Sequence, residues 1–184
     1  MPERSREWIV FSPPYPNNID YTEVYKIEAW ALELYGNSLE MKAQRLSTLR
    51  SHPSVLFPEK YNYQENPATR REIELLINPI LAAVPEDRYQ RGRKQVIVGY
   101  VDDMLSVLTN LRRVAAQNCS CAIVVGNSVH GSGESRYVIA ADLVLSRLAE
   151  LAGWAVEEIR VARNLRRRAA DVDHLRESVI ILRR

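Results

Sequence analysis

The segment from Trp8 to Tyr15 constrains the fold of this chain most, because an apolar run ends there at two consecutive prolines. The apolar side chains of Trp8 to Phe11 predict a buried β-strand. Proline has no N–H group to donate to a neighbouring strand, so strand pairing must stop at Ser12-Pro13-Pro14-Tyr15. Ligands bind open α/β sheets at the carboxyl ends of their strands, and the two prolines hold this loop rigid. We therefore expect a preorganised binding loop from Ser12 to Tyr15.

The rest of the chain alternates between helical and strand-like patterns, which predicts an α/β fold. Apolar residues at helical spacing predict helices at 21–35, at 69–84, from 88 or 91 to 116, and at 138–152. Short apolar or alternating runs predict strands at 121–126, 154–162 and 177–182. The connection at 164–176 is too short for a full crossover helix, so the last two strands should pair antiparallel.

Residues 36 to 67 interrupt this pattern, because they show little periodicity and contain Pro53, Pro58 and Pro67. We expect an irregular insertion here, with a short helix around Leu39 to Leu46. Long loops inside a compact domain are usually functional or mobile. The whole chain, residues 1–184, is expected to form a single domain.

Composition limits the classes of protein to which the chain can belong. No apolar stretch reaches the roughly 20 residues of a membrane span, and the charged first residues do not resemble a signal peptide, so we expect a cytoplasmic protein. Cys119 and Cys121 lack the further ligands of a zinc site; we expect buried thiols and no metal site. The formal net charge of +2 is too small to indicate a nucleic-acid partner by itself.

The tetrapeptide Ser12-Pro13-Pro14-Tyr15 resembles the catalytic motif of the DNA amino-methyltransferases. Similarity to this family continues in order along the chain at TLRSHP (48–53), VVGNS (124–128) and LRESVI (175–180). A serine in the first position is common among the cytosine-N4 enzymes, whereas aspartate or asparagine is more usual for adenine. The resemblance implies a site-specific, restriction–modification type enzyme that transfers a methyl group from S-adenosylmethionine to the exocyclic amine of cytosine (N4) or adenine (N6) in DNA.

The chemistry of amine methylation explains the residue types in this motif. An exocyclic amine is a weak nucleophile because its lone pair is delocalised into the ring. The Ser12 hydroxyl and a carbonyl of Pro13-Pro14 can accept its protons and turn the lone pair outward. The ring of Tyr15 offers a face on which a base flipped out of the duplex can stack. The alternative is a proline-rich turn with a packed tyrosine.

Polar residues elsewhere are candidates for contacting DNA. The resemblance places the loop of Arg50, Ser51 and His52 beside the active site, although His52 is equally explained as a turn histidine bonded within its own loop. Asn127 and Ser128 follow a predicted strand and should lie at the same sheet edge as Ser12. The consecutive Arg166, Arg167 and Arg168 can neutralise phosphates or form a solvated loop.

Two further patterns favour a structural role rather than a functional one. We expect a solvated helix face to explain Asp102 and Asp103, since the proposed chemistry needs no pair of carboxylates. The glycines within 127–133 match neither the Walker spacing nor the dinucleotide fingerprint, so we expect a flexible turn that leads into the next helix.

One part of the family fold has no counterpart in this sequence. Methyltransferases bind S-adenosylmethionine at a glycine-rich turn after the first strand of the sheet, and no such turn occurs here. We therefore expect a partial, Rossmann-like methyltransferase sheet with a reversed final strand and without its cofactor-binding half. A second polypeptide or missing segment would carry that half and cover the open edge of the Trp8 to Phe11 strand. Alternatively, the chain is a truncated, inactive remnant that at most binds nucleic acid or a partner.

Overall fold

The computed structural model of the chain describes residues 6–17, 19–131, 135–165 and 175–184. Its main sheet has four strands in the order β1-β2-β6-β5, formed by β1 (Arg6–Phe11), β2 (Ala115–Gly126), β6 (Arg176–Arg183) and β5 (Ala155–Asn164). Strands β1 and β2 are parallel, whereas β6 is antiparallel to both β2 and β5. The C-terminal strands thus pair as their short connection predicts.

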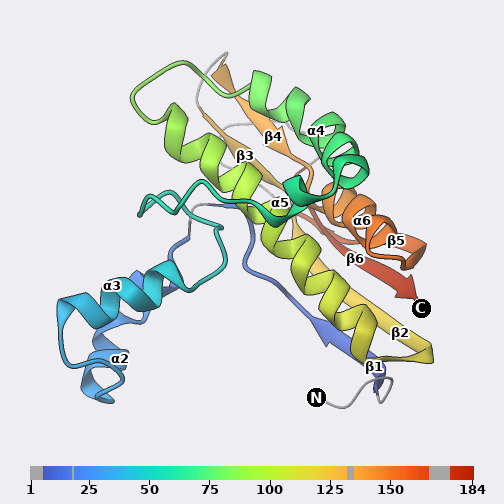
Figure 1. The fold of residues 1–184 in the computed structure, drawn as a ribbon, viewed down its shortest axis with the longest axis horizontal. Coiled ribbons are helices and arrows are strands. Elements are labelled where there is room, and N and C mark those ends of the chain that lie inside the picture. The colour runs from blue at the N-terminus through green and yellow to red at the C-terminus, as the bar shows by residue number, and fades with distance from the viewer. Residues whose placement is uncertain (1–5, 18, 132–134, 166–174) are drawn as a thin grey trace.

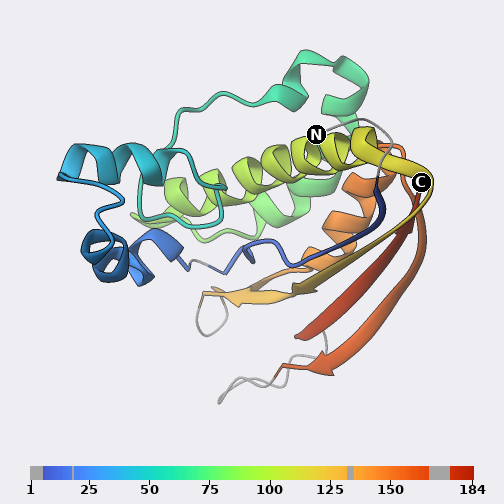
Figure 2. The ribbon, with the colours of Figure 1, turned by 90° about the horizontal axis from the view of Figure 1, so that it is seen from below.

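Three helices cover one face of this sheet: α4 (Pro67–Ala82), α5 (Gln90–Val114) and α6 (Ala141–Leu151). Figure 2 shows all three on the same side of the strands. Ile123 and Ile180 lie in register on β2 and β6, and both are fully buried beneath these helices together with Leu108 and Leu145. Burying each such side chain contributes about 1.5–3 kcal/mol, so this layer holds the strands in place.

The other face of the sheet has no helix over it among the residues that the structure describes (Figure 2). Side chains alternate along a strand, so Ile9 and Phe11 pack on the core while Trp8 and Val10 face away from it. Trp8 is 73% exposed and Val10 is 71% exposed. The prediction that this strand is buried is therefore wrong for one of its two faces. Within the described sheet, β1 is an edge strand that pairs only with β2.

A helical arm extends beyond the sheet (Figure 1) and consists of α1 (Tyr21–Val24), α2 (Lys26–Ala31) and α3 (Ser38–Leu46). The prediction of one helix over 21–35 is wrong, because α1 ends after four residues and neither α1 nor α2 contains a buried residue. Isolated helices are marginal without a packed face. The short helix expected near 39–46 is present as α3. A 3₁₀ turn (η1, Asn62–Glu65) then leads into α4.

Two boundaries differ from the predictions. Helix α5 passes directly into β2 at Ala115, so this strand begins six residues before the predicted Cys121. The flexible turn expected at 127–133 is wrong for residues 128–130, which form β3 (Ser128–His130) and pair antiparallel with β4 (Tyr137–Ile139), whereas residues 132 and 133 lie outside the described residues. Because β4 pairs with β3, the next helix begins at Ala141 rather than at Val138.

Candidate active site

The loop from Ser12 to Tyr15 follows β1 at the carboxyl edge of the sheet, beside the end of the parallel strand β2. Ser12 is exposed, and its hydroxyl donates a hydrogen bond of 3.0 Å to the carbonyl oxygen of Val124. A serine hydroxyl has one hydrogen and two lone pairs. The Tyr15 hydroxyl lies farther from Ser12 Oγ, at 3.5 Å. With its hydrogen donated to the nearer Val124 carbonyl, Ser12 retains lone pairs that can accept a hydrogen bond.

Tyr15 is held by contacts at its hydroxyl and at its ring. The hydroxyl donates to Oε1 of Glu177 at 3.0 Å, and Arg163 Nε donates to the other carboxylate oxygen at 2.8 Å. Arg163 holds the pKa of the Glu177 carboxyl below its ordinary value, so this group is ionised at neutral pH. Burial raises the pKa of the Tyr15 phenol, which therefore keeps its proton. The ring lies against Gly126, the last residue of β2.

Ser128 and His130 fix the backbone immediately after this loop. The Ser128 hydroxyl donates to the carbonyl oxygen of Pro16 at 3.0 Å, and Nε2 of His130 lies 2.9 Å from the same oxygen. The same nitrogen lies 2.8 Å from the Ser128 hydroxyl oxygen, so the two side chains and the Pro16 carbonyl form one cluster. The His130 ring stacks on Tyr137 of β4, with ring centroids 5.2 Å apart. The β3–β4 hairpin thus anchors Pro16. Ser128 is buried and holds the backbone of the loop in place.

Asn127 belongs to a buried network around Asp142, the second residue of α6. Its side-chain oxygen accepts the backbone N–H of Asp142 at 3.1 Å. The fully buried Asp142 carboxylate accepts hydrogen bonds from Arg176 Nε and Ser178 Oγ, both at 2.8 Å. Burial acts to raise the pKa of Asp142, but the hydrogen bonds from Arg176 and Ser178 outweigh it and hold the pKa below its ordinary value. This network ties α6 to the starts of β3 and β6.

Arg50 is anchored to helix α5 rather than presented at the surface. Its guanidinium contacts Asp102 at 2.6 Å and Asp103 at 2.7 Å, and its side chain lies directly over Gly99, where a Cβ atom would come within 2.7 Å of it. Asp102 is 1% exposed, so the prediction of a solvated helix face is wrong for this residue. Its carboxylate is buried because it pairs with Arg50 and accepts the backbone N–H of Tyr63.

Ser51 and His52 are also buried, each being 2% exposed. The ring of His52 lies between the core and the arm, with Nδ1 3.5 Å from Oδ2 of Asp20. Asp20 also caps α1 and accepts a hydrogen bond of 2.7 Å from Arg45 of α3. Neither ring nitrogen of His52 has a hydrogen-bond partner within the described part of the chain. The segment from Arg50 to His52 therefore forms the base of the arm.

The predicted DNA contacts Arg166, Arg167 and Arg168 lie outside the described residues. Among the residues that are described, no cluster of histidine, cysteine or acidic side chains could hold a metal ion. Cys119 and Cys121 are both free and buried, and burial raises the pKa of the Cys121 thiol to about 12. Over the same residues, no helix is long and apolar enough to cross a membrane.

Comparison with known proteins identifies relatives of this chain. It is 30% identical over 171 residues to the type II methyltransferase M.AvaI of Nostoc sp., and equally to M.AvaI of Anabaena variabilis. The match covers 88% of this chain and 34% of each relative. This chain is a distant homologue of a type II methyltransferase. It spans about a third of the length of the relatives it matches. No protein-family model matches it, and no solved structure matches it significantly.

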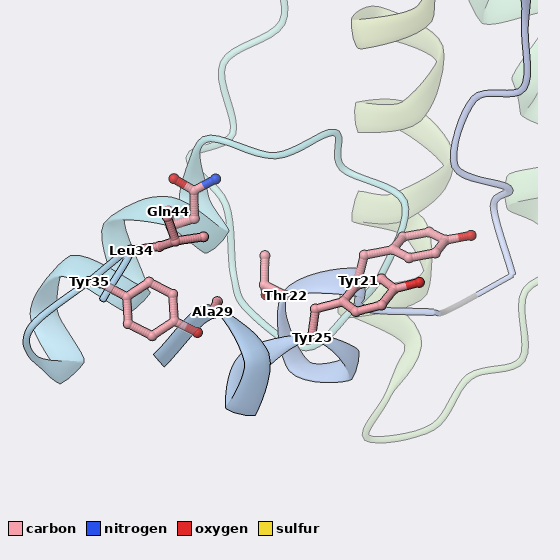
Figure 3. A pocket seen from close by; sticks show the side chains of 7 residues that line it. All are labelled: Tyr21, Thr22, Tyr25, Ala29, Leu34, Tyr35 and Gln44. Atoms are coloured by element: carbon pink, nitrogen blue, oxygen red, sulfur yellow. The ribbon is translucent and has the colours of Figure 1, made fainter. Parts of the chain in front are cut away.

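The arm and the region beside the loop from Ser12 to Tyr15 contain two different pockets. A pocket of about 440 Å³ lies in the arm, and it is lined by Tyr21, Thr22, Tyr25, Ala29, Leu34, Tyr35 and Gln44. Figure 3 shows the rings of Tyr21 and Tyr25 on one side of it, with Leu34 and Tyr35 on the other. No residue from Ser12 to Tyr15 lines this pocket. A smaller, polar pocket of about 300 Å³ lies beside the loop, and Asn17, Arg93, Ser128 and His130 contribute to its lining.

Sequence reasoning missed the residues that support Tyr15. Glu177 and Arg163 belong to strands that follow Tyr15 by more than 140 positions in the sequence, and no local pattern connects them to it. The available signal was the similarity at 175–180, which includes Glu177. Gly126 lies within the similar segment at 124–128, but no sequence pattern indicates that it provides the space for the Tyr15 ring.

Proposed function

We propose that this chain is the substrate-facing part of a DNA amino-methyltransferase whose target is the N4 amine of cytosine, with the N6 amine of adenine as the alternative target. The observation that carries the proposal is the orientation of Ser12. Its hydroxyl hydrogen is used by Val124, so an exposed acceptor is left at the end of β1. A nearby rigid aromatic ring, Tyr15, completes the features that such a reaction needs in a base pocket.

The proposed role of the loop is to orient the target base. Ser12 Oγ and a carbonyl of Pro13-Pro14 would each accept a hydrogen bond from one N–H group of the exocyclic amine, which rotates the lone pair out of conjugation with the ring. Tyr15 would stack on the flipped base, which is worth roughly 1–3 kcal/mol. These groups hold and turn the amine, and no covalent intermediate with the protein is needed.

S-adenosylmethionine supplies the methyl group in this proposal, but the described residues do not form a site that fits it. Within the described residues, β1 is an edge strand, and the segment that follows it contains prolines instead of the glycine-rich turn that would hold the cofactor. We assign cofactor binding to a second polypeptide or further segment that covers β1, beginning with the exposed Trp8 and Val10. The greater length of the matched relatives supports this assignment.

The order of the strands also supports the proposal that this chain is the substrate-facing part of the enzyme. Strand β6 runs antiparallel between β2 and β5, as the reversed final strand of a methyltransferase sheet would. For DNA, we propose that the base is held by Ser12 to Tyr15 and that phosphates are contacted by Arg166, Arg167 and Arg168. The buried Arg50, Asn127 and Ser128 would then support the site from within, since their side chains are hydrogen-bonded to protein groups. Ser51 and His52 are buried as well and would act in the same way, by packing at the base of the arm.

The test is a methyl-transfer assay with three samples: this chain, a polypeptide with the glycine-rich half of a related methyltransferase, and both together. Only the combined sample should transfer labelled methyl groups to DNA, and nucleoside analysis should identify N4-methylcytosine. In that sample, Ser12→Ala should lower the single-turnover rate roughly fivefold or more while DNA affinity stays nearly constant, because one hydrogen bond contributes about 1 kcal/mol.

Two results would contradict the proposal in different ways. DNA binding without methyl transfer by the combined sample would favour the inactive remnant. An unchanged single-turnover rate in Ser12→Ala would exclude Ser12 as an acceptor of the amine proton.

A further inference from the structure

Glu177 lies on the middle one of three neighbouring strands at the edge of the proposed site. In the sheet, Glu177 of β6 lies in register with Gly126 of β2 on one side and with Arg163 of β5 on the other. Cross-strand partners present their side chains on the same face. A carboxylate, a bare glycine and a guanidinium therefore form one row across the sheet, next to the loop that carries Tyr15.

The glycine in this row makes room for the Tyr15 ring. A Cβ atom on Gly126 would lie 2.9 Å from Cε2 and 3.1 Å from Cδ2 of Tyr15, which is too close for a real contact. The ring therefore lies directly on the backbone of β2. From that position its hydroxyl reaches Oε1 of Glu177 at 3.0 Å. Backbone contact limits the tilt of the ring, and the hydrogen bond limits its rotation.

Arg163 holds the Glu177 carboxylate in place. Its Nε donates to Oε2 at 2.8 Å, and its Nη2 lies 3.3 Å from Oε1. Charge-assisted hydrogen bonds of this kind are stronger and more directional than neutral ones. With Tyr15 on one side and Arg163 on the other, both oxygens of Glu177 are occupied by donors, which makes the group an anchor rather than a proton acceptor for a base.

We propose that Glu177 is a positioning residue that fixes the plane of the Tyr15 ring for the flipped base, with Arg163 fixing Glu177 in turn. This inference rests on the proposed function. Glu177 acts only through the Tyr15 hydroxyl, so removing either partner should have the same effect as removing both. A residue that merely stabilised the sheet would show independent, additive effects.

The test compares Glu177→Ala, Glu177→Gln, Tyr15→Phe and the double variant Tyr15→Phe/Glu177→Ala in the combined enzyme. Glu158→Gln is the matched control, because this exposed carboxylate also pairs with an arginine on β5 but lies away from Tyr15. Base flipping is followed by the fluorescence of 2-aminopurine at the target position, and methyl transfer by single-turnover kinetics.

We expect Glu177→Ala and Tyr15→Phe each to weaken base flipping and to slow transfer about fivefold, the effect of one lost hydrogen bond. The double variant should lose no more than either single variant. Glu177→Gln keeps an acceptor oxygen and should recover most of the rate, and Glu158→Gln should match the wild type. Additive losses, or a Glu177→Ala variant as active as the wild type, would overturn the positioning role.

A measurement on this chain alone separates this inference from the proposed function. The phenol of Tyr15 can be titrated by NMR with ring-labelled tyrosine and assigned through Tyr15→Phe. Burial and the Glu177 carboxylate both raise its pKa, so Glu177→Gln should lower the Tyr15 pKa. An unchanged pKa would show that Glu177 does not hold the Tyr15 hydroxyl, whatever the activity of the combined enzyme. A shifted pKa with no methyl transfer by the combined wild-type sample would overturn the proposed function. It would still establish that Glu177 holds the Tyr15 hydroxyl.

Discussion

Gly126 and Tyr15 are in such close contact that a Cβ atom at position 126 would lie 2.9 Å from Cε2 of the tyrosine ring. We therefore expect Gly126→Ala to displace the ring from the sheet and to reduce methyl transfer by the combined enzyme about tenfold, since small misplacements of positioning groups are costly. Gly36→Ala is the control, because the nearest atom to a Cβ there is 3.9 Å away. Equal activity of the two variants would show that the position of the ring is unimportant.

Local patterns predicted the parts of this fold that depend on local forces. The stop of β1 at Pro13-Pro14 needs only the missing N–H groups, and the limits of α4 and α5 follow from apolar spacing over many residues. The same reasoning gives a wrong result at α1 and α2, where it predicts a single helix. Their apolar residues, such as Val24 and Ile27, have helical spacing but no core to pack on, and these two side chains are 56% and 77% exposed.

The candidate site could be located from the sequence, but the buried residues that hold the surrounding loops in place could not. Ser12 and Tyr15 are marked by the prolines between them. The pairing of Arg50 with Asp102 depends instead on how the loop crosses α5, and the two residues are 52 positions apart in the sequence. Charged residues are usually exposed, so sequence reasoning placed Asp102 on a solvated helix face and Arg50 in a loop that contacts DNA. Only the packing of the loop over Gly99 brings them together in the interior.

The buried pair of Arg50 and Asp102 should be important for stability. Asp102→Ala would leave the Tyr63 N–H group and part of the Arg50 guanidinium without a partner, and breaking a buried ion pair costs about 3–5 kcal/mol. Urea unfolding of this chain should therefore show a markedly lower midpoint. Glu59→Ala, which removes an exposed pair with Arg91, should cost less than about 1 kcal/mol. Similar midpoints for both variants would show that the Asp102 contacts contribute little.

The buried His52 should make stability depend on pH. Burial lowers its pKa below the ordinary value of about 6.5, and the nearby Arg45 acts in the same direction, while Asp20 opposes it. The unfolded chain then takes up a proton near pH 6.5, whereas the folded chain does not. Stability should fall as pH decreases through about 6.5, by up to about 1.4 kcal/mol per pH unit, and this contribution should level off below the folded pKa.

The measurement for His52 is the free energy of unfolding between pH 7.5 and pH 5, in the wild type and in His52→Gln. The variant has no titrating ring at this position, so its stability should change less over this range, whatever its absolute stability. Parallel curves for the two proteins would mean that His52 titrates equally in the folded and unfolded states.

The exposed Trp8 on β1 provides a direct probe of the proposed cofactor half. This chain has three tryptophans, of which Trp154 is buried, Trp30 lies on the arm, and Trp8 is 73% exposed on the face of the sheet without helices. In a Trp30→Phe background, adding the glycine-rich half should shift the fluorescence to shorter wavelength as Trp8 leaves water. The same background with Trp8→Phe should show no shift.

S-adenosylmethionine should bind weakly to this chain alone and more tightly once the shift is complete, as measured by calorimetric titration. Tight binding of the cofactor by the isolated chain, with Trp8 still exposed, would place the cofactor site within these residues and remove the need for a partner at β1.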